Sequence, residues 1–182
     1  MNAKPVDALR LDVAQLAAEG AELAGQWPLS ELTRLADMHM AGDGPAAEVQ
    51  WQVQGELRPV TGGAAEVWLH LQAQVELDLC CQRCLGPVHE TVTIAKPLRF
   101  VSDEAQAAAL DAEMEDDVLA LERTLDLREL VEDELLLALP LVPRHAECPV
   151  PLPMPADDAV ADEMANPFAA LAQLKTRGSG QT

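Results

Sequence analysis

The chain has few aromatic side chains and few bases. Tyrosine is absent, aromatic residues make up 3% of the 182 residues, and 12 Lys and Arg stand against 31 Asp and Glu, so that the net charge is −19. A core in a chain of this length must therefore be built mainly from Leu, Val and Ala. A surface with this charge balance repels a phosphate backbone at long range and attracts basic partners.

The sequence signatures of several enzyme classes are also missing. The chain contains no G-x-G-x-x-G, P-loop, H-E-x-x-H or G-x-S-x-G motif. Its carboxylates are abundant, but they cluster without an apolar pocket that would raise the pKa of one of them. We therefore expect no catalytic residue, no enzymatic activity and no small-molecule substrate.

Long apolar runs are lacking as well. The longest run, residues 135–142, is too short to span a bilayer, and the N-terminal residues show no continuous apolar segment typical of a secretory signal. Four cysteines, three of them clustered, do not make the disulfide framework of a secreted domain. We expect a cytoplasmic protein with reduced thiols and no membrane contact.

Three runs of alternating apolar and polar residues are present, at 49–57, 67–79 and 88–94, and short turns separate them. A period of two in runs joined by short turns is typical of an antiparallel meander that packs one face on a core. From Asp126, a plausible N-cap, the apolar period becomes helical, and Pro140 ends the predicted helix. The fold class expected is α+β, an antiparallel β-meander with packed helices.

Two further segments indicate helix. Leu29, Leu32 and Leu35 recur at helical spacing, with Ser30 available as a cap, and the acidic, Ala-rich residues 103–121 favour a loop with some helix.

The C-terminal part reads as a mobile, proline-rich tail. Six prolines between residues 140 and 155 favour an extended or disordered linker. Beyond it, Asn166 and Pro167 start a short amphipathic helix that would pack Phe168 on the domain or in a partner's groove. The expected organisation is a single α+β domain at 1–145, a proline-rich acidic linker at 146–165, and a tail helix with a disordered end at 166–182.

The thiols gather in the sequence CCQRC, between the second and third alternating runs. Cys81 and Cys84 form a Cys-x-x-Cys pair, which supplies two of the four ligands of a structural zinc site. The donors expected to complete the site are His145 and Cys148, spaced H-x-x-C, with His89 in reserve. A zinc knuckle is therefore one interpretation of these thiols.

Two other interpretations of the thiols stay open. A tight hairpin turn whose cysteines are buried or spare would need no metal. A redox couple would need its first cysteine at a helix N-terminus, whereas this pair lies between strands, where only Arg83 would lower a thiol pKa.

Two sets of residues are candidates for partner contacts. Trp68 has the parity opposite to the apolar face, so we expect it to be exposed and able to stack on a base, with Arg83 and Lys96 in a small basic patch on the meander. The second set belongs to the acidic block 103–134, which holds 13 acids and two bases. Its candidates are Glu129, Glu132, Asp133 and Glu134.

Three segments share the order and spacing of one known family: CQRCLGPV at 81–88, LVEDELLLALPLVPRH at 130–145 and NPFAALAQLK at 166–175. Together they closely resemble the YceD family, the bacterial large ribosomal RNA subunit accumulation proteins. The resemblance extends from about Trp51 to Lys175.

The resemblance implies a non-enzymatic cytoplasmic factor in large ribosomal subunit biogenesis, which supports the synthesis, processing or stability of 23S rRNA. It carries over Cys81, Cys84, the helix 130–139 and Phe168 with its preceding proline. Some relatives have enough cysteines after this helix for a second Cys-x-x-Cys, whereas this chain has Cys148 alone.

Different mechanisms remain open. The protein would bind precursor 23S rRNA through the sheet around Trp68, or it would be an acidic chaperone whose block 103–134 screens the charge of a basic ribosomal protein. A small zinc-knuckle binding module is a further alternative. The expected partner is thus the large ribosomal subunit precursor, through its 23S rRNA, a basic ribosomal protein, or both.

Overall fold

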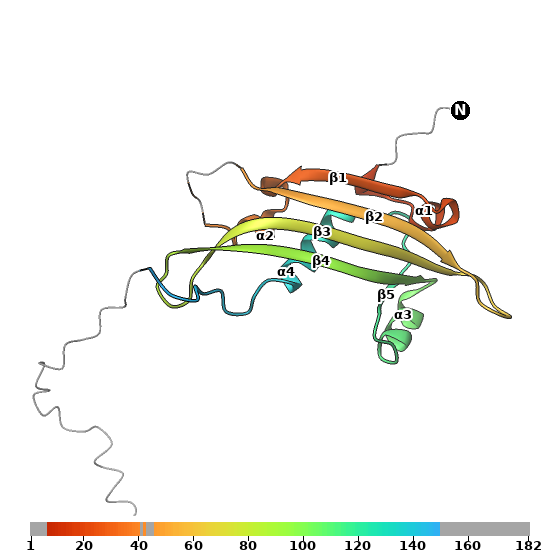
Figure 1. Cartoon of the computed structure of the whole chain (residues 1–182). Helices are drawn as coiled ribbons and strands as arrows, with labels where there is room; N and C mark the ends of the chain where they lie inside the picture. The colour runs from red at the N-terminus through yellow and green to blue at the C-terminus, as the bar shows by residue number, and fades with distance from the viewer. Residues whose placement is uncertain (1–6, 41, 43–45, 150–182) are drawn as a thin grey trace, which may run out of the picture. The chain divides into compact units, whose positions relative to one another are not determined.

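A five-stranded sheet forms the centre of the computed structural model, which describes residues 7–40, 42 and 46–149 (Figure 1). The strands lie in chain order. Four of them form an antiparallel meander, and the fifth pairs with the fourth in parallel. The α+β prediction with its meander is confirmed, and the parallel edge strand makes the sheet mixed. The strands are β1 (Glu22–Pro28), β2 (Glu48–Arg58), β3 (Glu66–Cys80), β4 (Pro87–Val101) and β5 (Asp117–Ala120).

Helical segments lie before, between and after these strands. Asp126 accepts hydrogen bonds from the N–H groups of Arg128 and Glu129 and so caps α4, as the sequence predicts. No helix in the described part of the chain is long and apolar enough to cross a membrane. The helical segments are η1 (Ala8–Arg10), α1 (Val13–Glu19), η2 (Leu29–Glu31), α2 (Thr33–Ala36), α3 (Glu104–Asp111) and α4 (Leu127–Leu137).

The sheet has two unlike faces. The odd-numbered residues of β2 and β3 point to the helix face, where α1, α2 and α4 cover the core, as Figure 1 shows for α4 behind β3 and β4. The backbones of β2 and α1 approach each other closely there, because a Cβ added at Gly55 would lie 2.5 Å from the backbone N of Ala17 in α1. The even-numbered residues point to the other face, which we call the open face. Among the described residues, α3 covers the far end of this face, where Ala107 packs against Val101 and Val118.

Glu132 ties α4 to the start of α2. Its Oε1 accepts the N–H groups of Arg34 at 2.7 Å and Leu35 at 3.1 Å, and its Oε2 accepts the Arg34 guanidinium at 2.8 Å. The carboxylate thereby does from another helix what a cap residue does locally, and Ser30 is not the cap of α2. The sequence places Glu132 among the residues expected to be available to a partner. The structure corrects this, because Glu132 is buried, with 7% of its surface exposed.

Glu132→Ala should lower the free energy of unfolding by about 2–3 kcal/mol, because buried N–H donors and a guanidinium lose their acceptor. Burial opposes ionisation of this carboxyl, but the N–H of Leu35 and the contacts with Arg34 outweigh it and lower its pKa below 4.5. The contribution is therefore present above about pH 4.5 and is lost as the pH falls through the lowered pKa. Urea unfolding at pH 7 measures it, with the exposed Glu129→Ala on the same helix as control. Equal stability of both variants would contradict the tie.

Candidate metal site

The turn between β3 and β4 folds into a knuckle. The N–H of Cys81 donates to the carbonyl of Gly86 at 2.9 Å, and the N–H of Leu85 donates back to the carbonyl of Cys81 at 2.9 Å. Leu85 takes a left-handed conformation, with φ of 61°, which closes the turn. Cys81 is thereby fully buried at the end of β3, and Cys84 follows on the outer side of the same turn.

The segment after α4 runs back to this knuckle. The N–H of Gln82 donates to the carbonyl of Pro143 at 2.8 Å, which fixes the returning chain beside the turn. The structure thus brings together the four residues that the sequence predicts as ligands. One donor atom from each of Cys81, Cys84, His145 and Cys148 lies within 4.8 Å of the other three.

Two distances within the cluster match those of a tetrahedral zinc site. The Sγ atoms of Cys81 and Cys148 are 3.9 Å apart, and Cys84 Sγ lies 3.5 Å from His145 Nδ1. Zn–S bonds of about 2.3 Å and Zn–N bonds of about 2.0–2.1 Å at tetrahedral angles require about 3.8 Å between two sulfurs and about 3.5 Å between sulfur and nitrogen. A sulfur separation of 3.9 Å is far longer than a disulfide bond, and all four cysteines are free.

His145 is oriented as a ligand by its other nitrogen. Nε2 lies 2.9 Å from the carbonyl oxygen of Pro87, which only accepts hydrogen bonds, so that Nε2 carries the ring proton. In the neutral ring Nδ1 then keeps a free lone pair, and this atom faces Cys84 Sγ. A backbone carbonyl that fixes the tautomer in this way is a usual outer partner of a metal-bound histidine.

The surroundings favour ionisation of one thiol. Burial of Cys81 opposes ionisation, but the backbone N–H groups of Cys84, Arg83 and His145 outweigh it and lower the pKa of this thiol to about 5. Burial, and then hydrogen bonds with Cys84 and Cys81, raise the pKa of Cys148 to about 11. The cluster therefore holds one thiolate readily and keeps a second thiol protonated, unless a cation compensates the charge.

The other candidate ligand lies elsewhere. His89 is on the open face, where its Nδ1 is 3.1 Å from Asp78 Oδ1, and it is not part of the cluster. Cys80, adjacent to Cys81, is also outside it, since its Sγ lies 3.8 Å from the carbonyl of Leu85.

The predicted basic patch does not form. Trp68 is 3% exposed, so the expectation of an exposed ring is wrong. Arg58 covers the ring at 4.0 Å, and the indole N–H donates to Glu66 Oε2 at 3.0 Å. Trp68 is paired with Arg99 and Cys80 with Pro87, so Trp68 and the knuckle with Arg83 lie twelve residues apart along β3, or about 40 Å.

Lys96 also points away from Trp68. It pairs with Leu71 and lies on the helix face, where its Nζ donates to Glu134 Oε2 at 2.7 Å and forms an ion pair with Asp117. Burial lowers the pKa of Lys96, but Asp117 and Glu134 outweigh this and raise it. Lys96 therefore carries its positive charge, and two acids within the fold compensate it.

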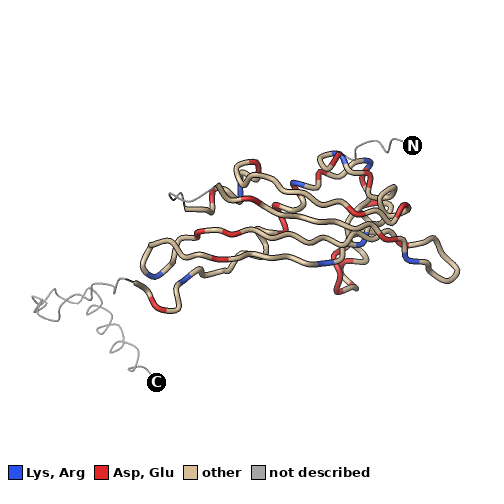
Figure 2. Tube along the Cα trace, turned by 45° about the horizontal axis from the view of Figure 1, so that its top comes forward, with Lys and Arg blue, Asp and Glu red and all other residues tan. Residues whose placement is uncertain are grey.

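The four predicted acids of α4 do not form one surface. Glu129 is exposed, whereas Glu132 is buried, Asp133 pairs with Arg34 at 2.6 Å and Glu134 pairs with Lys96. In Figure 2 acidic residues are instead spread along strands and helices, with few Lys and Arg between them. Phe168, the remaining candidate, lies outside the described residues.

Comparison with known proteins assigns the family. Residues 69–175, which include the knuckle, α4 and all four clustered residues, match the sequence profile described as "Large ribosomal RNA subunit accumulation protein YceD". The chain belongs to the YceD family.

One curated YceD relative, from Haemophilus influenzae, is named "Large ribosomal RNA subunit accumulation protein YceD" and is 37% identical over 111 residues. The match covers 58% of this chain and 64% of the relative, which is less than two thirds of the relative's length. No solved structure matches the chain.

Trp68→Ala should lower the free energy of unfolding by about 3 kcal/mol, as truncation of a buried tryptophan does. Trp68→Phe keeps a ring under Arg58 and loses the hydrogen bond to Glu66, so it should cost about 1 kcal/mol. Urea unfolding of both variants measures the difference. Wild-type stability of the Ala variant would show that the side chain is exposed, as the sequence pattern suggested.

Proposed function

We propose that this chain supports the accumulation of large-subunit ribosomal RNA as a non-enzymatic factor in large-subunit biogenesis. The observation that supports the role is the match to the YceD profile over 69–175, the region that builds the knuckle and α4. The relative's name supplies the process and no chemistry. The chemistry of the protein has to be argued from its own residues.

We further propose that the cluster of Cys81, Cys84, His145 and Cys148 holds a structural Zn²⁺. Three thiolates and one imidazole complete a tetrahedral shell and leave no open position for water, so the metal would stabilise the fold and would not catalyse a reaction. Its effect would be to hold residues 143–148 against the β3–β4 turn. The charge of the cation would also compensate the Cys148 thiolate, whose formation the free cluster disfavours.

The charge distribution favours a basic protein over RNA as the direct partner. Near Trp68, Lys96 and Arg99 are paired with acids, and Arg58 is paired with Glu56 and stacked on Trp68. Arg83 is exposed but lies at the knuckle, far from Trp68, so the sheet around Trp68 offers no free charge to phosphate. Exposed acids such as Glu104, Glu113 and Glu115 keep the region around α3 negative. We propose that accumulation of the RNA follows indirectly from binding of a basic protein that assembles with it.

Metal analysis tests the zinc proposal. Protein purified under reducing conditions should contain about one zinc per chain. Cys84→Ser or Cys148→Ser should weaken zinc affinity by more than the roughly 10- to 100-fold expected for loss of an outer-shell partner. Cys80→Ser, next in sequence to Cys81 but outside the cluster, is the matched control and should keep its metal. Folded wild-type protein without bound zinc, and with no affinity for added zinc, would refute the site.

Ribosomal RNA levels test the role. Deletion of the gene should lower the ratio of large- to small-subunit rRNA, and expression of the wild-type chain should restore it. If zinc holds the working fold, Cys148→Ser should restore the ratio less well than Cys80→Ser. An unchanged ratio after deletion would refute the role whatever the metal analysis shows.

A further inference from the structure

The open face carries an uncharged polar surface that the sequence analysis did not single out. Six exposed glutamines point outward from three neighbouring strands, and the register places them in adjacent rows. They are Gln26 on β1, Gln50, Gln52 and Gln54 on β2, and Gln72 and Gln74 on β3. The signal was present in the sequence, because glutamine occupies even positions in the same runs whose odd positions are apolar.

The glutamines line a hollow that continues toward the β3–β4 turn. A shallow cavity of about 690 Å³ lies over Gln26, Gln52 and Gln72. A second cavity, of about 400 Å³, shares Gln50 and Gln74 with the first and extends the hollow toward the end of the sheet.

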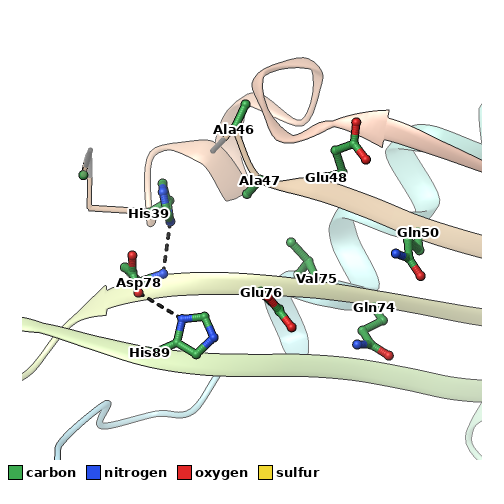
Figure 3. A pocket seen from close by; sticks show the side chains of 11 residues that line it. His39, Ala46, Ala47, Glu48, Gln50, Gln74, Val75, Glu76, Asp78 and His89 are labelled. Carbon is green, nitrogen blue, oxygen red and sulfur yellow. Dashed lines mark hydrogen bonds and ion pairs between the residues drawn. The ribbon is translucent and has the colours of Figure 1, made fainter. Parts of the chain in front are cut away.

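Acids and histidines line the second cavity. Figure 3 shows Glu48, Glu76 and Asp78 there, together with His39 and His89. The N–H of Asp78 donates to His39 Nδ1 at 3.1 Å, and its carboxylate lies 3.1 Å from His89 Nδ1. Neither Glu48 nor Glu76 has an ion-pair partner among the residues that the structure describes.

Most of the glutamine amides are free to bind. Gln52 donates to Glu22 at 2.9 Å, whereas the other five make no side-chain hydrogen bond to another described residue. A carboxamide offers donors and an acceptor, which are the groups that an extended peptide backbone needs. Successive glutamines on one strand recur every two residues, about 6.7 Å, which is also the repeat of an extended peptide.

The charges of the open face favour a positively charged partner. Glu48, Glu76 and Asp78 lie at one end, and Glu22 and Glu56 lie toward the other. Within the described residues, the Lys and Arg side chains on this face are Arg58 and Arg99, which both lie at the α3 end. Arg58 pairs with Glu56 at 3.0 Å and Arg99 with Glu66 at 2.8 Å. A phosphate backbone would therefore meet amides and carboxylates, while Lys or Arg side chains would meet complementary charge.

The geometry points to the open face as a docking surface for an extended, basic polypeptide segment. The segment would lie along β2 and β3, with its backbone on the glutamine amides and its Lys or Arg side chains on the acids at the ends. From Glu48 to Glu56 the surface is about 27 Å long and would hold about nine extended residues. This inference deepens the proposed binding of a basic protein by naming the surface and the form of the partner.

Fluorescence anisotropy with a labelled nonapeptide of alternating Lys and Thr tests the inference in full-length, zinc-loaded protein. The same peptide with Glu in place of Lys should not bind. The double variant Glu48→Lys/Glu76→Lys should weaken binding about tenfold, because two attractions become repulsions. Glu122→Lys/Glu129→Lys, with the same change in net charge at exposed sites away from the open face, is the matched control and should bind nearly as well as wild type.

A second variant distinguishes binding at the open face from general attraction to the negative net charge. Gln50→Ala/Gln74→Ala leaves the net charge unchanged. It should still weaken binding of the basic peptide, because the peptide backbone loses its amide partners. Thermal unfolding checks that each variant is folded. Equal weakening by both charge variants, or no effect of the amide variant, would show general attraction to an acidic protein and overturn the proposed surface.

A single-stranded RNA oligonucleotide is the competing probe. Tight RNA binding that is lost in Gln50→Ala/Gln74→Ala would make the open face an RNA surface and overturn the peptide proposal. Absence of binding to the basic peptide would also overturn it. These readouts do not depend on rRNA levels in cells, so the docking surface and the role in rRNA accumulation can fail separately.

Discussion

The long β3–β4 hairpin is the constraint on which the rest of the structure depends. Its register, from Val67 opposite Phe100 to Cys80 opposite Pro87, decides which side chains enter the core and which face water. The buried parity includes Leu69, Leu71 and Leu77, each with no exposed surface. A slip of one residue would exchange the two faces, so the cost of exposing this leucine row fixes the knuckle and the glutamine rows together.

Sequence patterns predicted the parts of the fold that have a strong local period. The runs at β2, β3 and β4 and the α4 helix with its Asp126 cap were all visible. The edge strands were not: β1 contains Gly25 and Pro28, which are poor strand residues, and β5 has four residues inside an acidic segment. Nor could the N-terminal tie of α2 be predicted, because its acceptor, Glu132, is 98 residues from Arg34.

The candidate metal site was likewise predictable in part from local sequence and in part not. The spacing of the cysteines and His145 indicated a common donor set, since a tight turn and a short H-x-x-C segment each converge locally, but the path that returns residue 143 to Gln82 is tertiary. The errors at Trp68 and Lys96 have separate causes. Lys96 has the buried parity of its own strand, whereas Trp68 has the open parity and is buried although it lies on that face, where Arg58 covers its ring.

The net charge of −19 does not act as one field, because many acids have local structural tasks. Asp12, Asp103 and Asp126 cap helices, Glu132 holds α2, and Glu134 neutralises Lys96. What remains for a partner is the charge that the fold leaves unpaired, and on the open face Glu48 and Glu76 carry such charge beside the uncharged amides. The Asp78–His89 pair of that face lies two residues from the end of the hairpin ladder at Cys80 and Pro87. A cation held at the knuckle would therefore brace the same end of the sheet on which the acidic cavity lies, and so connect the proposed metal site with the proposed binding surface through one hairpin.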